Sequence, residues 1–380
     1  TTGFTAVSGV GYFVNTTGGI ITVTLPSSPA AGAVVAVSDY AGTADTNNIT
    51  IGRNGSNING AAADLTVSNE NSAVTLVYVD GTQGWKATDT SSLSDIELTP
   101  TYVTATGGTI TTSGDFKIHT FTGPGTFTVC SVGNPAGSTA VDYLVVAGGG
   151  GGGGGCNGSG GASGAGGGGY RTNFPGSGTP VTVQGYPIII GGGGTAGTSV
   201  SPGTINGDGV NGGNSSGLGI ISAGGGGGNH GPCASLDGQP GGSGGGASGG
   251  NPKPRTGGSG NTPPTPVSQG NNGGNTGTCG SSTIYDSAGG GGAGGVGQNS
   301  QPGPRAGGVG SANLISGSAV TYAAGGRGGN YAGSPEPNAS EPANSGNGGV
   351  GKSGGPAGTN DQPGGTGGSG IVVIRYKFQN

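Results

Sequence analysis

The chain has 380 residues, of which 101 are Gly and 23 are Pro, and its formal net charge is −5. Glycine, usually about 7% of a protein, adds no apolar area and loses the most backbone entropy on ordering, so one ordinary globular core is excluded. A typical disordered tail is also excluded, because the net charge is low and apolar patterning persists in places. The apolar runs are too short to cross a bilayer, so we expect no membrane insertion.

Glycine and charge both change in density at one point of the chain. Residues 1–147 contain 19 Gly, and residues 148–380 contain 82. The first part carries ten acidic and three basic residues, whereas the second carries six acidic and eight basic ones. We therefore expect two regions that differ in how they fold, with the boundary after Ala147.

Short segments rich in β-branched residues predict that the first region is β-structured. Turn sequences such as Asn54-Gly55 separate these segments. The predicted strands cover residues 12–14, 20–25, 33–37, 49–51 and 74–79. They indicate a small N-terminal β domain over residues 1–87, in which Tyr78 and Trp85 pack in the core or at an edge. The polar residues 88–100, which end at Pro100, predict a linker.

A second β unit follows the predicted linker. Its predicted strands cover residues 109–112, 116–121, 126–130 and 141–147, and the Gly-Pro-Gly turn at 123–125 predicts a hairpin between the second and third. The last segment, residues 371–378, also has strand character. Since neither it nor residues 141–147 can bury itself within glycine-rich sequence, we expect one β anchor unit of residues 101–147 plus 370–380, with residues 148–369 inserted.

The inserted region, residues 148–369, is punctuated by glycine runs such as Gly148 to Gly155. Collagen is excluded because a strict three-residue glycine period is missing. A flexible Gly/Ser linker is one interpretation. The other is a bundle of polyproline II (polyglycine II) helices, whose outward N–H and C=O groups bond to neighbouring helices. Apolar patches beside the runs, such as Ile188 to Ile190, favour the ordered bundle.

Two segments that flank the inserted region resemble the glycine-rich domains of tailed-bacteriophage tail fibres. They are Val141-Asp-Tyr-Leu-Val-Val-Ala-Gly-Gly-Gly150 and Gly367-Gly-Ser-Gly-Ile-Val-Val-Ile-Arg-Tyr376. Residues 1–90 resemble a small β domain of marine phage fibres, notably at residues 19–26 and 77–86. The resemblance implies a distal fibre protein or adhesin in the virion, trimeric and in contact with other tail-fibre subunits.

The glycine-rich region is also similar to the glycine-helix sandwich of T-even phage adhesins, whose variable loops contact the host receptor. This chain departs from that pattern because it ends in a predicted β-strand. The arrangement of the adhesin loops therefore cannot be carried over to this sequence.

The sequence offers little catalytic or metal-binding chemistry, so we expect no enzyme activity, cofactor or metal site. His119 alternates with Lys117 and Phe121 in a predicted strand, which indicates a surface or edge position. His230 lies three residues before Cys233, but a second pair at ligand spacing is missing. The stretch Asn206-Gly-Asp-Gly209 lacks the nine-residue repeat of a calcium-binding β-roll and is typical of a turn.

The four cysteines are Cys130, Cys156, Cys233 and Cys279, and the last three lie beside glycine runs. A fibre assembled in a bacterial cytoplasm starts in the reduced state. Free thiols, a Cys156–Cys233 bridge and a Cys233–Cys279 bridge therefore remain open alternatives.

The side chains best suited to recognition lie between the glycine runs. Aromatic residues and arginines are typical anchors of binding surfaces, loops on a rigid scaffold are the usual place for them, and a basic balance suits an anionic polysaccharide. The alternative for any one of them is that it covers the bundle. The candidate receptor-binding residues are Tyr170, Arg171, Phe174, Lys253, Arg255, Tyr285, Arg305, Tyr322, Arg327 and Tyr331.

From these features we expect a non-catalytic phage tail-fibre adhesin that binds a host-surface glycan or an outer-membrane receptor, with no nucleic-acid partner. One alternative is a structural extracellular filament or surface protein that binds no receptor. Another is an ice-binding protein, although the sequence lacks the regular three-residue period of small residues which that class needs.

Overall fold

The computed structural model describes residues 3–90, 96–155, 160–176, 178–198, 207–231, 236–249, 254–277, 287–300, 305–329, 340–353 and 363–380. Among these residues the regular elements are all β-strands, with no helix, so the fold is mostly β as the sequence predicts. The chain divides into two compact units. The first contains residues 1–104, 131–139 and 377–380, and the second contains residues 105–130 and 140–376.

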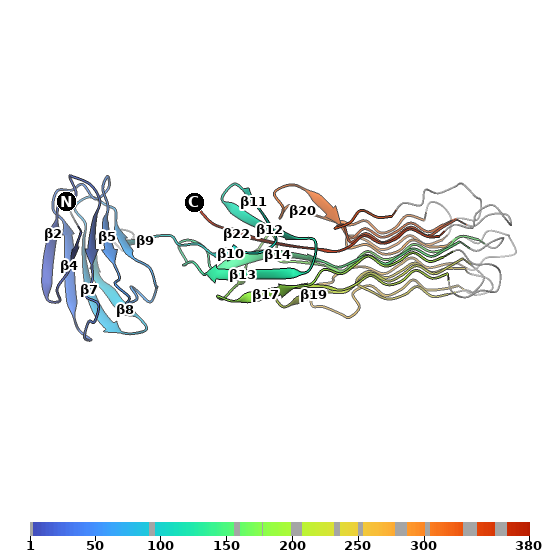
Figure 1. Ribbon diagram of the computed structural model, residues 1–380, viewed down its shortest axis with the longest axis horizontal. Helices are drawn as coiled ribbons and strands as arrows, with labels where there is room; N and C mark the ends of the chain where they lie inside the picture. The colour runs from blue at the N-terminus through green and yellow to red at the C-terminus, as the bar shows by residue number, and fades with distance from the viewer. Residues whose placement is uncertain are drawn as a thin grey trace. The chain divides into compact units, whose positions relative to one another are not determined.

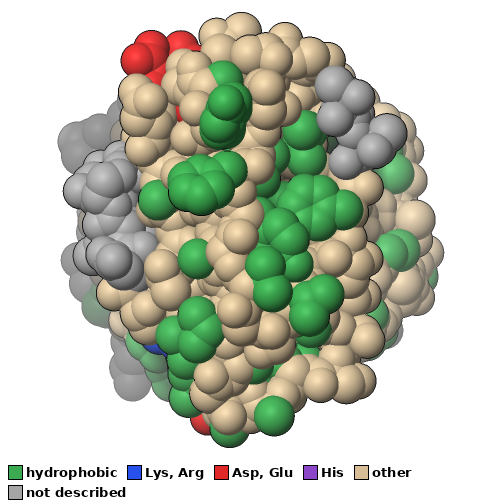
Figure 2. Space-filling model, turned by 90° about the vertical axis from the view of Figure 1, so that its left-hand side faces the viewer, with side chains coloured by type: hydrophobic (Ala, Val, Ile, Leu, Met, Phe, Trp, Pro, Cys, Tyr) green, Lys and Arg blue, Asp and Glu red, His purple; other side chains and the backbone are tan. Residues whose placement is uncertain are grey.

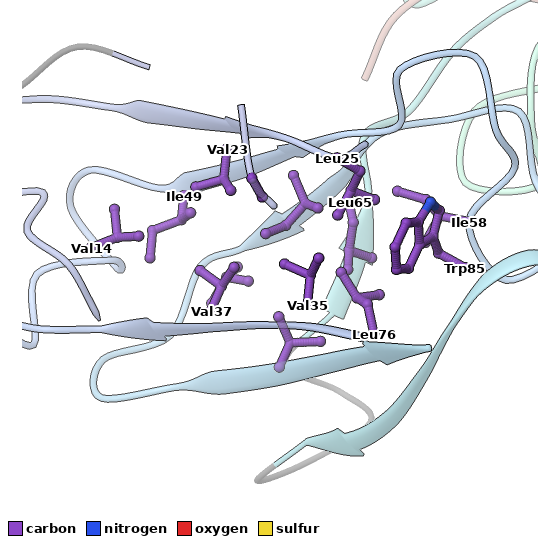
Figure 3. Close-up of a cluster of buried hydrophobic side chains, with 14 of the residues drawn as sticks. Val14, Val23, Leu25, Val35, Val37, Ile49, Ile58, Leu65, Leu76 and Trp85 are labelled. Atoms are coloured by element: carbon purple, nitrogen blue, oxygen red, sulfur yellow. The ribbon is translucent and has the colours of Figure 1, made fainter. Parts of the chain in front are cut away.

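Two β-sheets enclose the core of the first unit (Figure 1). The five-stranded sheet has the order β1-β3-β5-β6-β9, and the four-stranded sheet has the order β2-β4-β7-β8. Side chains from both sheets meet between them, as Figure 3 shows for Val23, Val35 and Leu76, which are fully buried. The strands are β1 (Phe4–Thr5), β2 (Val10–Val14), β3 (Ile21–Thr24), β4 (Val34–Asp39), β5 (Ile49–Gly52), β6 (Leu65–Val67), β7 (Ala73–Asp80), β8 (Gly84–Thr90) and β9 (Ile96–Leu98).

Trp85 is part of this core, which confirms its predicted packing role. Its side chain is 0% exposed, and its ring meets that of Tyr78 edge-on with the centroids 5.6 Å apart. The predicted linker over residues 88–100 is wrong in part. Strand β8 continues to Thr90, and β9 pairs with β6 in antiparallel register. Both are the last strands of their sheets, and an edge strand tolerates polar residues because backbone hydrogen bonds hold it in place.

The outward face of the four-stranded sheet carries apolar residues on β2 and β4. Gly11 of β2 lies beside Ala36 of β4, and the neighbouring Phe13 is 80% exposed. These residues line a shallow hollow of about 140 Å³. Figure 2 shows hydrophobic side chains distributed over the face turned to the viewer.

The remaining strands of the described residues form four further sheets, and two of these strands, β14 and β22, flank the glycine-rich region in sequence. Strand β14 pairs with β22 in antiparallel register, with Val146 opposite Ile371, so these two segments, which the sequence analysis places in one β unit, lie in the same sheet. The strands are β10 (Thr104–Thr106), β11 (Thr109–Ser113), β12 (Phe116–Phe121), β13 (Gly125–Ser131), β14 (Ala140–Val146), β15 (Tyr170–Thr172), β16 (Thr179–Pro180), β17 (Gly185–Ile188), β18 (Ser215–Gly217), β19 (Ile220–Ser222), β20 (Ser311–Asn313), β21 (Val320–Tyr322) and β22 (Ile371–Lys377).

The predicted hairpin between residues 116–121 and 126–130 does not form. Strand β12 lies in the sheet ordered β11-β12-β22-β14-β15, whereas β13 lies in the sheet ordered β10-β13-β17. The Gly-Pro-Gly turn therefore carries the chain from one sheet to another instead of returning it alongside β12. The surface or edge position predicted for His119 is also wrong. Its side chain is 0% exposed, because its ring stacks on Tyr376 and meets Phe127 edge-on.

Backbone hydrogen bonds with a three-residue period hold the glycine-rich segments together, and these segments run side by side (Figure 1). Every third N–H of residues 148–154 bonds to the same antiparallel neighbour: Gly148, Gly151 and Gly154 donate to the carbonyls of Gly213, Val210 and Gly207. Hydrogen bonds of this kind link residues 148–154 to six segments, which cover residues 163–166, 194–197, 207–213, 225–231, 349–352 and 365–368.

This glycine lattice replaces a side-chain core by close backbone packing. A Cβ added at Gly151 would lie 2.0 Å from the carbonyl oxygen of Thr195, and one at Gly166 would lie 2.1 Å from that of Ser243. Real Cβ atoms do not approach an oxygen so closely, so the spacing of the segments requires glycine. A flexible linker is thus excluded for the described segments.

Asparagine and aspartate side chains complete the lattice where a backbone carbonyl is missing. Asp208, Asn211 and Asn214 are spaced by three residues, and their side-chain oxygens accept from the N–H groups of His230, Gly227 and Gly224. We call these three residues the Asx ladder. The turn predicted for Asn206 to Gly209 is wrong over residues 207–209, which form no turn and whose backbone bonds to Gly154 and Gly228 in the lattice; Asn206 lies outside the described residues.

Candidate functional site

A pocket borders β15, the last strand of its sheet, and we call it the β15 cleft. Its volume is about 280 Å³. Strand β15 follows directly after the glycine segment 160–169 and pairs with β14, where Arg171 lies opposite Val145. The cleft is lined by Tyr143, Tyr170, Arg171, Thr172, Pro266, Val267, Ser268, Ala293 and Ser311.

The loop of residues 261–269 forms one wall of the β15 cleft, and two side chains hold its shape. Asn261 accepts hydrogen bonds from the N–H and the hydroxyl of Thr265. The buried side chain of Gln269 donates to the carbonyl of Pro263 (2.8 Å) and accepts from the N–H of Ala223 (2.9 Å). The N–H of Tyr170 also donates to the carbonyl of Gln269 (2.8 Å). The loop is thereby fixed both to β15 and to the lattice.

Polar contacts orient the two predicted residues of β15. A guanidinium N–H of Arg171 donates to the carbonyl of Ile221 (3.1 Å). The hydroxyl of Tyr170 accepts from the side-chain amide of Asn313 (2.7 Å). Burial raises the pKa of Tyr170, and the hydrogen bond from Asn313 opposes this shift. Tyr170 is therefore a neutral hydrogen-bonding group at physiological pH.

Phe174 belongs to a neighbouring apolar pocket of about 330 Å³. Tyr170 borders both pockets, and Pro175 and Leu314 also line the second one. The guanidinium carbon of Arg375 lies 3.9 Å from the ring centroid of Phe116 and 5.1 Å from that of Phe174. These cation–π contacts give Phe174 a role in holding the sheet together.

The structure brings some of the candidate residues together and separates others. Tyr170, Arg171 and Phe174 lie close together on β15 and just after it. Tyr322 is buried in the adjacent apolar cluster, so its ring is not available to a receptor, which makes its candidacy wrong.

Three candidate arginines lie at the opposite end of the glycine lattice from the β15 cleft. The carbonyl of Arg305 accepts a hydrogen bond from the N–H of Gly328. The N–H of Gly329, which follows Gly328, donates to the carbonyl of Ala162, and Ala162 precedes Tyr170 by eight residues. Arg327 is on the same segment as Gly328 and Gly329. Arg255 lies 4.0 Å from Asp237 in a partly exposed ion pair. These three residues are therefore not part of the cleft.

The other predicted candidates lie outside the described residues. They are Lys253, Tyr285, Tyr331, Cys156, Cys233 and Cys279. Of the cysteines, the structure describes Cys130, which is exposed and forms no disulfide.

His230 is buried at the lattice end that contains the arginines. Its Nδ1 lies 2.7 Å from a carboxylate oxygen of Asp208. Burial acts to raise the pKa of Asp208, but the hydrogen bonds and the charge of His230 lower it overall. Groups of three His, Cys, Asp or Glu side chains that could hold a metal ion do not occur among the described residues.

Several residues of the β15 cleft were not predicted from the sequence. Tyr143 lies in a predicted strand on the same face as Val141 and Val145, which are both buried, so period-two alternation gave no signal for its place in the cleft. Val267 and Ser268 come from a loop that no local pattern places beside β15. Only the long-range hydrogen bonds of Gln269 put them there.

Comparison with known proteins identifies a family. No curated protein matches this chain. In the described part of the chain no helix has the length and apolar character needed to cross a membrane. The model of the glycine-rich domain family matches residues 120–377, from β12 to the end of β22. The match covers most of the chain, and the protein therefore belongs to the glycine-rich domain family.

Proposed function

We propose that the glycine-rich segments are polyglycine II helices packed side by side. This helix has three residues per turn and no internal hydrogen bonds, so its N–H and C=O groups point to neighbours around the axis. The three-residue period of the hydrogen bonds and the six neighbours of residues 148–154 support this assignment. So does the lack of room for a Cβ at Gly151.

We further propose that the protein is a non-catalytic attachment protein of a phage tail fibre, where it binds a host-surface glycan or an outer-membrane receptor. The observation that carries this proposal is the β15 cleft, in which Tyr170 and Arg171 line one concave site on a rigid edge strand. Concave sites lined by aromatic rings with a few placed polar groups are the usual form of ligand pockets.

The backbone lattice adds a mechanical argument to this proposal. Its hydrogen bonds connect the segments in several directions, so a pull on one segment is shared by its neighbours. A lattice of this kind keeps the cleft in shape under the load that a fibre transmits. The placement in a virion and the homotrimeric state are further parts of the proposal, and the resemblance of residues 141–150 and 367–376 to phage fibre domains supports them.

A cell-binding experiment tests the attachment function. The fluorescently labelled full chain is added to a panel of Gram-negative strains, and bound fluorescence is measured by flow cytometry. We expect binding to a subset of strains, and we expect the double variant Tyr170→Ala/Arg171→Gln to reduce it strongly while Arg53→Gln leaves it unchanged. Absence of binding to every strain would favour the structural filament instead. Immunogold labelling of phage tails with an antibody to the chain tests the proposed location.

A further inference from the structure

We propose that the β15 cleft binds an acidic saccharide, with the carboxylate on Arg171 and a sugar ring against the tyrosine side chains. This inference rests on the proposed attachment function and names the chemical class of the receptor. It follows from the size, the wall chemistry and the charge of the cleft.

The size of the cleft limits the part of a saccharide that it encloses to about one or two sugar units. At about 280 Å³ it lies just below the range of roughly 300–1,000 Å³ that is usual for sites of drug-sized ligands. A folded peptide element or a protein surface would need a larger contact area. A short saccharide fits the space that the residues enclose.

The residues that line the cleft offer partners for both the apolar face and the polar rim of a pyranose ring. Tyr143 and Tyr170 supply aromatic surface, on which the apolar C–H face of a sugar can pack. Thr172, Ser268 and Ser311 supply hydroxyl groups for the polar rim of the sugar. Val267, whose side chain is 79% exposed, stands at the opening.

The charge of the cleft selects an anionic sugar. Among the residues that line it, Arg171 is the one charged side chain, and no carboxylate competes with a ligand there. The hydrogen bond to the carbonyl of Ile221 holds the guanidinium in position. A guanidinium has five N–H donors, so further donors are left for a carboxylate in a bidentate arrangement.

Calorimetric titration of the full chain tests the inference with two matched probes. One probe is a tetramer of mannuronate, and the other is the same tetramer after reduction of its carboxyl groups, which makes it neutral. We expect the acidic tetramer to bind at least about tenfold more tightly, the size expected for a charge-assisted hydrogen bond. Arg171→Gln should bring the two affinities within about threefold, whereas Arg53→Gln, which removes the same charge elsewhere, should preserve the difference.

Substitutions at the exposed Val267 provide a second readout that does not depend on a buried residue. Val267→Asp should weaken binding of the acidic tetramer, and Val267→Lys should strengthen it, while the neutral tetramer should bind both variants alike. Equal affinities of the native chain for the two tetramers would overturn the inference. So would equal losses in Arg171→Gln and Arg53→Gln, or a tetraglutamate peptide that binds as tightly as the acidic tetramer.

The outcomes separate this inference from the attachment function. If the labelled chain binds cells but shows no preference for the acidic tetramer, the inference fails and the attachment function stands. If the preference and its loss in Arg171→Gln are found but no strain is bound, the attachment function fails and the saccharide site stands.

Discussion

The imidazole Nε2 of His119 and the hydroxyl of Tyr376 form a buried hydrogen bond of 3.1 Å between residues 257 positions apart. The other ring nitrogen, Nδ1, lies 2.7 Å from the carbonyl of Gly107, which can only accept, so Nδ1 carries the proton. Nε2 therefore accepts from Tyr376, whose oxygen in turn accepts from the N–H of Ala105. This network joins β12, which precedes the glycine lattice, to β22, which follows it.

Breaking this network should destabilise the β-structure that frames the lattice. His119→Phe leaves the carbonyl of Gly107 and the hydroxyl of Tyr376 without their partner, and we expect a loss of about 1–3 kcal/mol in the free energy of unfolding. Urea denaturation measures this loss. Combined with Tyr376→Phe in a double-mutant cycle, the two changes should cost less than the sum of the single losses. Strict additivity would show that the two side chains do not interact.

The same histidine should make the protein less stable in mild acid. Burial lowers the pKa of His119 below its usual value, and Lys117 adds to this effect, while the hydrogen bond to Gly107 opposes it. The unfolded chain therefore binds a proton near pH 6.5, where the folded chain does not, so stability is complete above that pH and declines below it. We expect the melting temperature to fall between pH 7.5 and pH 5.

His119→Phe isolates the contribution of this one group, because other titrating residues act in both proteins. Burial raises the pKa values of Asp142 and Glu341, and these carboxyls affect native chain and variant alike. The fall in melting temperature should be smaller in the variant. An equal fall in both proteins would assign the acid sensitivity to other groups.

The sequence predicted strands β2, β3, β4, β5 and β7 of the first unit, because alternating β-branched residues such as Val35 and Val37 are a local signal. It did not predict β1, β6, β8 and β9. It also predicted that residues 141–147 and 371–378 belong to one β unit, since neither could be buried otherwise, and the structure shows that they pair. The sequence did not predict that the chain passes to another sheet after β12, because a Gly-Pro-Gly turn is compatible with a hairpin and with a crossover. What decides between them is the partner of β13, namely β17, which lies far along the chain.

The sequence predicted only some residues of the β15 cleft, and the reason again is tertiary packing. Tyr170 and Arg171 were identified because aromatic and arginine side chains stand out in glycine-rich sequence. Tyr322 was identified on the same ground, yet it is buried beside Ile315 and Ile371. Composition alone does not tell a recognition residue from the cover of an apolar cluster. The difference depends on tertiary packing.

Close packing in the lattice makes a sharp prediction about two glycines. Gly151→Ala would place a methyl group 2.0 Å from the carbonyl oxygen of Thr195, whereas at Gly192 an added Cβ meets nothing within 4 Å. We expect Gly151→Ala to destabilise the second unit severely. Gly192→Ala should be neutral or stabilising by about 0.4–1 kcal/mol, because it restricts the unfolded chain. Thermal unfolding followed by circular dichroism compares them, and similar behaviour of the two variants would contradict the lattice packing.

Gln269 should position the wall of the β15 cleft without touching the ligand. Gln269→Ala removes the hydrogen bonds to Pro263 and from Ala223, so the loop of residues 261–269 loses its attachment to the lattice. We expect weaker binding of the mannuronate tetramer together with a stability loss of about 1–3 kcal/mol. Gln184→Ala, at an exposed position, is the matched control. Unchanged binding in Gln269→Ala would mean that the loop wall is not used.

The Asx ladder predicts that Asn211 acts only as an acceptor. Its side-chain oxygen accepts from the N–H of Gly227 at 2.7 Å, and Asp208 fills the equivalent place for His230 with a carboxylate. Asn211→Asp keeps an oxygen there and should leave the free energy of unfolding nearly unchanged. Asn211→Ala leaves the buried N–H of Gly227 unpaired and should cost about 1–3 kcal/mol. Chemical denaturation distinguishes the two. If Asn211→Asp lost as much stability as Asn211→Ala, the side-chain amide would have to act as a donor, and the three-residue spacing of Asp208, Asn211 and Asn214 would need another cause.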